Sequence, residues 1–402
     1  MGLYLAGFLL AGATGGIVAL AIIAVLVRRH VVGSPPSPRR NPPEGISILK
    51  PLCGFDDDLE ANLERFATMD HARFELLLGV KNTGDTAFPV ALAAAKRWPD
   101  RVRVVVQNGE PGLNPKVNQL VTLARAAKYE ILVVSDSNAI AGPGYLQEIS
   151  ALFEDPNVGC VTNPVAGEGE ASLGALLDNL HLSSAIGPGQ IGAMWSVKQP
   201  LVVGKSMALR KSDLAALGGF EAYTSALAED FVIGRAVRNQ LQKDVVIARM
   251  PVLNLARHRS VGDFGRRYIR WSVIHRTAVM PTTYASQGLL NPAPLAWLAW
   301  LFHPTGTFAL AAAFITIAKA AVDVASASTL RGRSFGLVGL AVVPLKDFLI
   351  FIAWLNGWFA RTVNWRGNRL RVTHGSRLIP PDDFVPLPAT FPEPEPVQTP
   401  EP

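Results

Sequence analysis

Apolar residues are concentrated at the two ends of the chain and leave a patterned middle. Residues 2–27 carry no charged side chain, and about twenty apolar residues are enough to span the hydrocarbon core of a bilayer. Basic residues follow this run at Arg28 and Arg29 instead of preceding it, which is typical of an uncleaved anchor with its downstream side in the cytoplasm. The pattern predicts a transmembrane anchor over residues 1–28 and a Pro-rich linker over residues 29–44.

Two further apolar stretches lie in the last third of the chain. One covers residues 289–322 and is broken near Pro304, and the other covers residues 335–360 and contains Lys346 and Asp347. We expect these two charges either to pair inside a helical bundle or to mark a segment that lies partly in the membrane interface.

The end of the chain constrains how often these stretches cross the membrane. Four arginines follow the last stretch and favour a cytoplasmic end. Either each stretch then crosses once, or the first forms a hairpin and the second does not cross. We assign residues 285–362 to a membrane-embedded region and residues 363–402 to a basic, then Pro- and Glu-rich tail, with disorder expected from residue 379.

Short β-rich runs alternate with helical patterns between the anchors. The predicted strands are residues 45–50, 74–81, 101–107 and 130–136, and the predicted helices between them are residues 57–69, 89–98 and 115–127. Such alternation is typical of an α/β fold with a mainly parallel sheet covered by helices on both faces. We expect one α/β domain over residues 45–263, followed by an amphipathic interface helix over residues 264–284.

Composition supports a membrane-attached protein and excludes several classes. Of 402 residues only 17% are charged, below the roughly 25% usual for soluble domains. The net charge of +6 suits an anionic membrane surface or a phosphorylated substrate, but it is too weak and scattered for nucleic acid. Two cysteines imply no disulfide framework. The basic flank and the absence of compartment signals favour a bacterial inner membrane.

Two acidic motifs are candidates for chemistry. Asp136 directly follows an apolar strand in SDSN, at the sheet edge where ligands of parallel sheets bind. Its carboxylate would hold a divalent cation that neutralises a diphosphate, or it would only form a turn. In ALAED, Glu229 and Asp230 begin a predicted helix, and Asp230 is either a general base or a helix cap.

Two basic motifs are candidates for anion binding. In NPKVNQL, Lys116 and Asn118 lie next to a helix start, where a phosphate or sugar contact and a solvated lysine are both reasonable. In RYIRW, Arg267 and Arg270 share a helix face beside Trp271. This run would clamp a diphosphate and line a sugar or lipid site, or it would rest on anionic lipid. There is no GxGxxG after the first strand and no P-loop motif.

The order of these motifs is more specific than any one of them. KPLCG (50–54), VKNTGD (80–85), NPKVNQL, SDSN, GKSMALRK (204–211), AED and RxxRW together resemble the ceramide glucosyltransferase family. That family is similar to the wider group of membrane-anchored GT-A glycosyltransferases, so the resemblance implies a Rossmann-like GT-A catalytic domain between transmembrane helices. NWRGNRLR, after the last apolar stretch, also resembles the end of the family's chains.

The resemblance implies a role for each matched residue. Asp85 would contact the uridine, Asp136 would bind the metal–diphosphate, and Asp230 would deprotonate the acceptor hydroxyl. Arg270 would assist catalysis by balancing the leaving group. The UDP-sugar site as a whole would comprise Lys50, Asp85, Lys116, Asn118, Asp136, Arg267, Arg270 and Trp271. The implied cofactor is Mg²⁺ or Mn²⁺ on Asp136, although the motif here is DSN and not DxD, and Asn138 is a weaker ligand than a carboxylate.

The resemblance also implies a reaction. A hexose, with glucose favoured, would pass from a UDP-sugar to the primary hydroxyl of ceramide with inversion at the anomeric carbon. The partners are then the UDP-sugar donor, a ceramide-like lipid acceptor and the bilayer. The alternatives are another sugar, a hopanoid acceptor, a processive polysaccharide synthase, or a membrane scaffold without catalysis.

Overall fold

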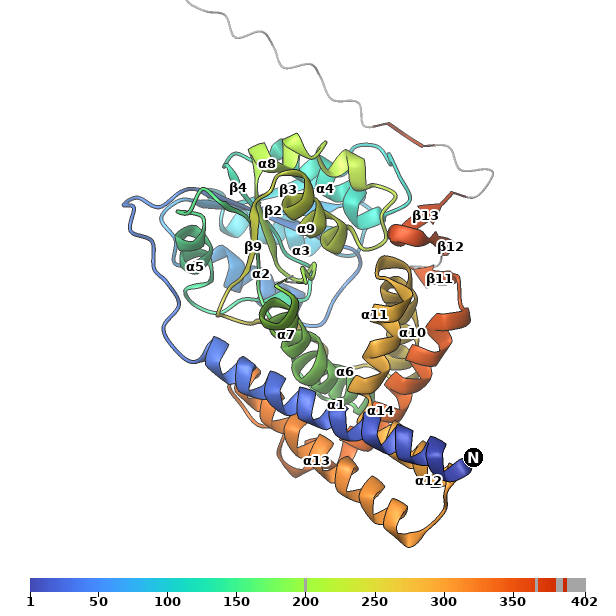
Figure 1. The fold of residues 1–402 in the computed structure, drawn as a ribbon. Coiled ribbons are helices and arrows are strands. Elements are labelled where there is room, and N and C mark those ends of the chain that lie inside the picture. Colours follow the sequence, from blue (N-terminus) through green and yellow to red (C-terminus); the bar gives the residue numbers. More distant parts are fainter. Residues whose placement is uncertain (199–200, 366–367, 381–385, 389–402) are drawn as a thin grey trace, which may run out of the picture.

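The computed structural model describes residues 1–198, 201–365, 368–380 and 386–388. An α/β domain lies to one side of a group of long apolar helices, and the N-terminal helix begins far from that domain (Figure 1). This arrangement separates a polar region, which carries the candidate site residues, from the apolar ends of the chain.

The α/β domain is built on a seven-stranded sheet with the order β3-β2-β1-β4-β8-β6-β9. Its strands are β1 (Ile46–Pro51), β2 (Phe74–Val80), β3 (Val102–Val106), β4 (Ile131–Val134), β6 (Val158–Thr162), β8 (Met207–Arg210) and β9 (Asp244–Ile247). Strands β1 to β4 pair in parallel, and β8 runs antiparallel to both of its neighbours. The expected mainly parallel sheet is therefore confirmed.

Helices cover both faces of this sheet because its strands bury side chains in both directions. Ile46 and Ile48 pack on one side with α2 (Leu59–Ala67), α3 (Phe88–Arg97) and α5 (Tyr145–Leu152). Leu49 points to the other side. The helices there are α4 (Pro115–Ala126), α8 (Lys211–Ala216) and α9 (Glu229–Gln240), with the short η2 (Phe220–Tyr223). Near-continuous apolar strands are the sequence pattern of such doubly covered sheets.

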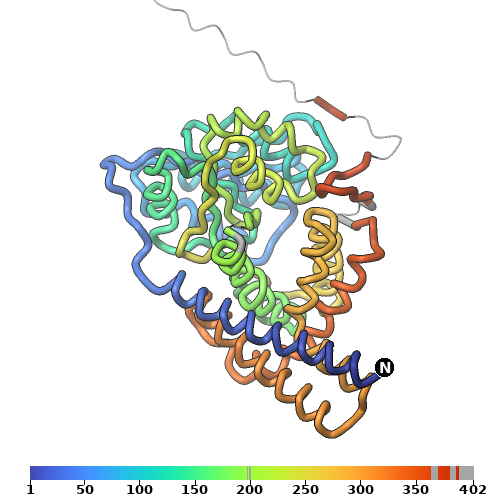
Figure 2. The backbone as a smooth tube through the Cα atoms, in the orientation of Figure 1, coloured from blue at the N-terminus to red at the C-terminus, as the bar shows by residue number. Residues whose placement is uncertain are grey.

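A second sheet connects the α/β domain to the helices below it. It has the order β5-β10-β7, formed by β5 (Ala139–Ile140), β7 (Val165–Glu168) and β10 (Val252–Leu255). The chain leaves β7 into a helical run of α6 (Leu173–His181), the π-helical η1 (Leu182–Ile186) and α7 (Gly187–Val197), and leaves β10 into α10 (Val261–Ala278) and α11 (Pro281–Ser286). Figure 2 shows these green and gold segments between the α/β domain and the apolar helices.

Within the described residues, three helices are long and apolar enough to cross a membrane: α1 (Gly2–Val31), α13 (Gly306–Arg331) and α14 (Gly336–Phe359). The shorter α12 (Pro292–Phe302) follows η3 (Gln287–Leu290), and the expected break before α13 is confirmed at residues 303–305. Gly16 packs on Leu289, and Gly2 lies against the Phe302 carbonyl, so α12 runs antiparallel to α1. Leu330 then packs beside Val27, which shows that α13 returns along α1.

Helix α14 takes a different course, because both of its ends contact elements attached to the α/β domain. Phe335 packs on Leu180 of α6 at its start. After its end, Val363 packs with Leu227 and Val273. These contacts lead into a small antiparallel sheet of β11 (Thr362–Trp365), β12 (Asn368–Thr373) and β13 (Arg377–Ile379), with η4 (His374–Ser376) between the last two strands.

The charges within the apolar helices pair inside the bundle, which confirms one of the two expectations for Lys346 and Asp347. Lys346 Nζ lies 2.5 Å from Asp347 Oδ1 and 2.9 Å from Asp323 Oδ2, and Lys319 Nζ lies 2.5 Å from Asp323 Oδ2. All four side chains are buried. Mutual pairing is the arrangement that keeps ionised groups tolerable among apolar helices.

The tail that was expected to be disordered lies mostly outside the described residues. Within residues 386–388, the Leu387 backbone exchanges two hydrogen bonds with the backbone of Glu110, at 2.6 and 3.1 Å. The C-terminal segment therefore contacts the loop that precedes α4.

Candidate active site

Charged side chains from four segments meet around Lys116 at the carboxyl edge of the large sheet. Lys116 Nζ lies 2.9 Å from Asp136 Oδ1 and 2.9 Å from Glu229 Oε1. Its third contact is the Gly204 carbonyl, at 3.4 Å. One ammonium group thus joins the loop after β4, the start of α9 and the segment before β8.

The start of α4 places Lys116 at this position. Asn114 caps the helix, because its Oδ1 accepts the backbone N–H groups of Lys116 and Val117 at 3.0 and 3.2 Å. Its Nδ2 donates to the Ala226 carbonyl at 2.7 Å and to Glu229 Oε2 at 3.2 Å. The same residue therefore fixes the beginnings of both α4 and α9.

Asp136 is held between two ammonium groups. Besides Lys116, Lys205 Nζ lies 2.9 Å from Asp136 Oδ2, and it also donates to Asn138 Oδ1 at 2.7 Å. Burial by itself would raise the pKa of Asp136, but Lys116 and Lys205 outweigh that effect and hold the pKa well below its usual range. Asp136 is consequently ionised at neutral pH.

Lys50 binds the loop after β4, which carries Asp136. Its side chain is fully buried, its Nζ donates to the Asp136 carbonyl at 2.9 Å, and the ammonium lies 3.9 Å from the centre of the Phe66 ring. Burial lowers the pKa of Lys50 to about 7. Lys50 also donates to the Ser135 hydroxyl at 3.4 Å and to the Ala139 carbonyl at 3.3 Å, so the structure gives it a loop-shaping position.

Asp230 faces the same cluster from the first turn of α9. Its Oδ1 accepts the Phe231 N–H at 2.8 Å, and its Oδ2 accepts the N–H of Gly204. A Cβ atom on Gly204 would lie 2.6 Å from Lys116 Nζ and 3.0 Å from Asp230 Oδ2, so no larger residue fits there without a shift. Burial, helped by Glu229 and opposed by Lys116, raises the pKa of Asp230 to about 6. A carboxylate with such a pKa is suited to accept a proton near neutral pH.

Two other expected site residues shape the loops that follow β2 and β3. Asp85 Oδ1 accepts the N–H groups of Gly54 and Ala87, each at 2.9 Å. Asn118 is buried and uses both ends of its amide on Gly112, at 3.1 Å to the N–H and 2.8 Å to the carbonyl. Asn118 thus orders the Gly- and Pro-containing loop before α4, and its amide is occupied there.

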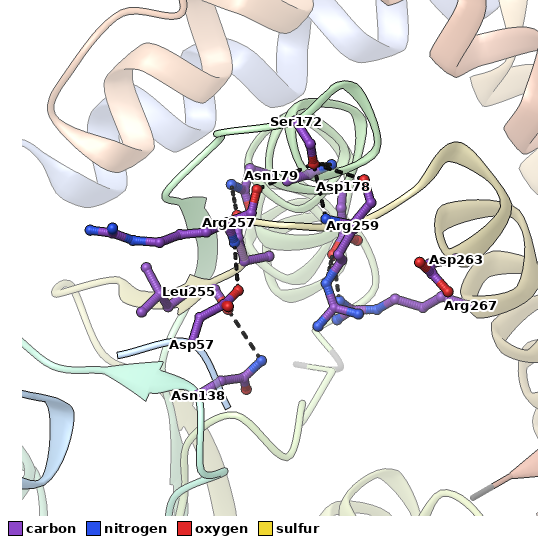
Figure 3. Close-up of polar contacts among 12 residues, drawn as sticks. Asp57, Asn138, Ser172, Asp178, Asn179, Leu255, Arg257, Arg259, Asp263 and Arg267 are labelled. Atoms are coloured by element: carbon purple, nitrogen blue, oxygen red, sulfur yellow. Dashed lines mark hydrogen bonds and ion pairs between the residues drawn. The ribbon is translucent and has the colours of Figure 1, made fainter. Parts of the chain in front are cut away.

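The RYIRW run lies on α10, where Arg267 is tied to a buried carboxylate. Arg267 Nη1 lies 2.7 Å from Asp178 Oδ2, and Tyr268 donates to Asp178 Oδ1 at 2.9 Å. Figure 3 shows Arg267 and Arg259 converging on Asp178 from different segments. The guanidinium of Arg267 also lies 5.0 Å from the centre of the Trp271 ring, within cation–π range.

The charge of Arg267 on α10 affects the pKa of Lys205 in the cluster. Burial lowers the pKa of Lys205, Asp136 opposes that shift, and the charge of Arg267 adds to it. Arg270 lies on the same helix, is half-buried and has a polar partner. The structure therefore brings together Lys50, Lys116, Asp136 and Asp230, with the arginine helix close by.

Sequence reasoning missed three residues that shape the site. Lys205 lies within GKSMALRK, where a lysine beside the small Gly204 was the available signal. Asn114 precedes a proline at a helix start, which is a capping pattern. Asp178 is an acidic residue in the apolar run GALLDNL, and a lone carboxylate there needs a cationic partner.

Comparison with known proteins identifies the family of this chain. The model of glycosyl transferase family 21 matches residues 10–378. The chain belongs to glycosyl transferase family 21. Ceramide glucosyltransferase 3 of Caenorhabditis elegans is 25% identical over 350 residues, covering 84% of this chain and 74% of that protein. Ceramide glucosyltransferase 1 of the same organism is 26% identical over 351 residues, covering 83% and 73%.

A solved structure shares the fold. It is the mannosyltransferase PcManGT from Pyrobaculum calidifontis in complex with GDP-Man and Mn²⁺, with a TM-score of 0.50 and 18% identity, covering 89% of this chain and 98% of that one. The resemblance inferred from the ordered motifs is confirmed, and so is the expected GT-A fold. The family 21 chain is a glycosyltransferase, with apolar helices that associate it with a membrane.

The oxygen atoms of the cluster do not fit a divalent cation as they stand. Such a cation needs several oxygen ligands that are not already bound to positive groups. Asp136 and Glu229 each place an oxygen 2.9 Å from Lys116 Nζ. The other Asp136 oxygen and Asn138 Oδ1 both contact Lys205. The other Glu229 oxygen accepts a hydrogen bond from Asn114. Both Asp230 oxygens accept backbone N–H groups. Among the described residues, no group of three or more His, Cys, Asp or Glu side chains is arranged to hold a metal.

Proposed function

We propose that this family 21 enzyme transfers a hexose, with glucose favoured, from a UDP-sugar to the primary hydroxyl of a ceramide-like lipid. The observation that carries the proposal is a carboxylate with a raised pKa, Asp230, linked through Gly204 and Lys116 to the charged cluster at Asp136. The names of the Caenorhabditis elegans relatives support ceramide as the acceptor. The proposed reaction has two substrates, an acceptor lipid and a nucleotide-sugar donor.

The donor would lie along the carboxyl edge of the large sheet. Lys116 and Lys205 concentrate positive charge there, which favours a diphosphate. The loop held by Asp85 is next to α3 and is suited to border the uridine. Arg267, Arg270 and Trp271 on α10 would close the opposite side of the site, next to the diphosphate and the acceptor.

The acceptor hydroxyl is a poor nucleophile unless a base removes its proton. Asp230 would take that proton while the hydroxyl oxygen bonds to the anomeric carbon and the bond from that carbon to the diphosphate breaks. The electron pair of the broken bond leaves with UDP, where positive side chains stabilise it. One displacement at the anomeric carbon inverts its configuration.

The apolar helices would bring the site to an acceptor that stays in the bilayer. Removing a long-chain lipid from a bilayer costs about 0.8 kcal/mol per buried CH₂, so the site must come to the membrane surface. We infer a cytoplasmic catalytic domain at a bacterial inner membrane, since Arg28 and Arg29 end the first helix on that side.

The packing of the helices favours the hairpin alternative for the C-terminal region. Helices α12 and α13 would enter the membrane beside α1 and return, and α14 would lie along the surface with one face in lipid. That face carries exposed apolar side chains three or four residues apart: Leu345, Phe348, Ile352, Leu355 and Phe359.

Purified protein in lipid nanodiscs tests this proposal. Nanodiscs would contain ceramide, a hopanoid or diacylglycerol, and each would be incubated with a panel of UDP-sugars before mass spectrometry of the lipids. The proposal expects one added hexose on ceramide, with UDP-glucose as the best donor. Transfer only to another lipid would redirect the acceptor assignment, and chains of several sugars would favour a processive synthase.

A further inference from the structure

We propose that Lys205 is the residue that binds the donor diphosphate, so that a lysine ammonium supplies the charge that a divalent cation would otherwise provide at Asp136. This inference rests on the proposed nucleotide-sugar transfer and names a residue for it. Both carboxylate oxygens of Asp136 are already bound to lysines, Oδ1 to Lys116 and Oδ2 to Lys205.

The two lysines of the cluster differ in how many donors they have left. A lysine ammonium has three N–H donors. Lys116 uses three acceptors, namely Asp136, Glu229 and the Gly204 carbonyl. Within the described part of the chain, Lys205 contacts only Asp136 Oδ2 and Asn138 Oδ1, so one of its donors is available. Lys116 therefore has a structural role in the site, and Lys205 is the group that can bind a further anion.

The surroundings of Lys205 suit this task. Its side chain is 10% exposed, so its charge acts in an environment that screens it little. Asp136 keeps the ammonium in place and compensates its charge while the site is empty of donor. Asn138 takes part in the same contact, which gives the DSN motif a function: an amide oxygen accepts from a lysine without adding a second negative charge next to the diphosphate.

Lys205 would also serve the chemical step. When the bond between the anomeric carbon and the β-phosphate oxygen breaks, negative charge grows on that oxygen. A preorganised ammonium donating to the β-phosphate stabilises this charge more in the transition state than in the bound donor. Atoms and charges balance because the acceptor proton goes to Asp230 and UDP leaves with the electron pair.

Calorimetric titration of the full-length protein in detergent with UDP and with uridine tests the inference. Each ligand is titrated into wild type and into Lys205→Met, once with EDTA and once with Mn²⁺. The wild type should bind UDP equally well in both conditions. Lys205→Met should weaken UDP binding by roughly tenfold to a hundredfold, as expected for a charge-assisted hydrogen bond, and should leave uridine binding unchanged. Lys243→Met, which removes a lysine paired with Asp213, is the matched control.

A second variant tests whether the charge at position 205 is what UDP binding requires. Lys205→Arg keeps the charge and should retain most of the UDP affinity, and unchanged uridine binding by Lys205→Met shows that this variant is folded. Mn²⁺ should partly restore UDP binding to Lys205→Met, because that change frees Asp136 Oδ2 and Asn138 Oδ1 for a metal.

Two results would overturn the inference and spare the proposed function. One is wild-type UDP binding that disappears in EDTA and returns with Mn²⁺, and the other is Lys205→Met that binds UDP as the wild type does. Absence of UDP binding in every condition would instead remove the proposed function itself.

Discussion

The hydroxyl of Ser376 accepts a hydrogen bond from the backbone N–H of Ala228 at 3.0 Å, two residues before Asp230. The Ser376 carbonyl also accepts the Leu227 N–H at 2.8 Å, and Ser376 is fully buried with a φ of +62°. The C-terminal sheet, which follows the last apolar helix, thus holds the segment that leads into Glu229 and Asp230.

Substituting Ser376 by glycine isolates this contact. Glycine adopts a positive φ without strain, so the change removes the hydroxyl and leaves the buried Ala228 N–H without its acceptor. An unsatisfied buried donor costs about 1–3 kcal/mol, and we expect kcat to fall by up to about tenfold with little change in the KM for the donor. Steady-state kinetics checks this split. The control is Ser286→Gly, which changes an exposed serine in another part of the chain. An equal loss of kcat in both variants would contradict the positioning role of Ser376.

The carboxylate of Asp230 should act as the base. Asp230→Asn keeps the size of the side chain but cannot accept the proton, so turnover should fall by roughly 10²–10⁴ while UDP still binds. Transfer assays and UDP titration measure the two properties separately. A variant that turns over as fast as the wild type would show that another group takes the proton.

The pH profile of the enzyme should report the same residue. Because a base must be deprotonated and the pKa of Asp230 is raised to about 6, the rate should increase as pH rises through that value and then level off. Glu229→Gln removes a neighbouring negative charge and should lower the pKa of Asp230, which shifts the acid limb to lower pH. If the acid limb of the pH–rate profile is at the same pH in Glu229→Gln as in the wild type, a group other than Asp230 titrates there.

The charged network within the apolar helices should be sensitive to single changes. Asp323 is buried and contacts both Lys319 and Lys346, so Asp323→Ala leaves two buried cations short of a partner. Breaking a buried ion pair typically costs 3–5 kcal/mol, and we expect a loss of about that size in the free energy of unfolding in detergent. The double variant Asp323→Leu with Lys346→Met should recover part of it. A double variant less stable than Asp323→Ala would argue against charge pairing as the reason for the network.

Cysteine labelling distinguishes the two membrane arrangements. In a Cys53→Ser background, Thr305→Cys lies in the α12–α13 turn and Ser334→Cys lies between α13 and α14, and both positions are exposed. With the hairpin, a membrane-impermeant thiol reagent applied outside intact cells should label Thr305→Cys and not Ser334→Cys. Labelling of Ser334→Cys from outside would instead show that each apolar stretch crosses once.

Much of the fold could be predicted because it follows from local patterns. The strand at residues 74–81 and the helix at residues 115–127 are found at Phe74–Val80 and Pro115–Ala126, since an apolar run between polar turns and a helix opened by proline are local signals. The break before α13 was equally visible from the proline at residue 304.

The polar contacts of the site could be predicted only in part, because they join distant segments. Arg267 pairs with Asp178, which is 89 residues away in the chain, and this structural contact could not be predicted from the RYIRW run. Asn118 has the right neighbours in sequence, but its amide is used by Gly112. Sequence order identified the cluster of Asp136 and Asp230, while the role of Lys205 depends on contacts that only the fold brings about.

The most direct measurement is mass spectrometry of lipid extracts from cells that make ceramide and express either the wild-type chain or Asp230→Asn. A new glycosylceramide with one hexose in the wild type, absent or nearly so with Asp230→Asn at equal protein levels, is the predicted result. Identical lipid profiles in the two strains, with the wild-type protein folded in the membrane, would contradict transfer to ceramide at this site.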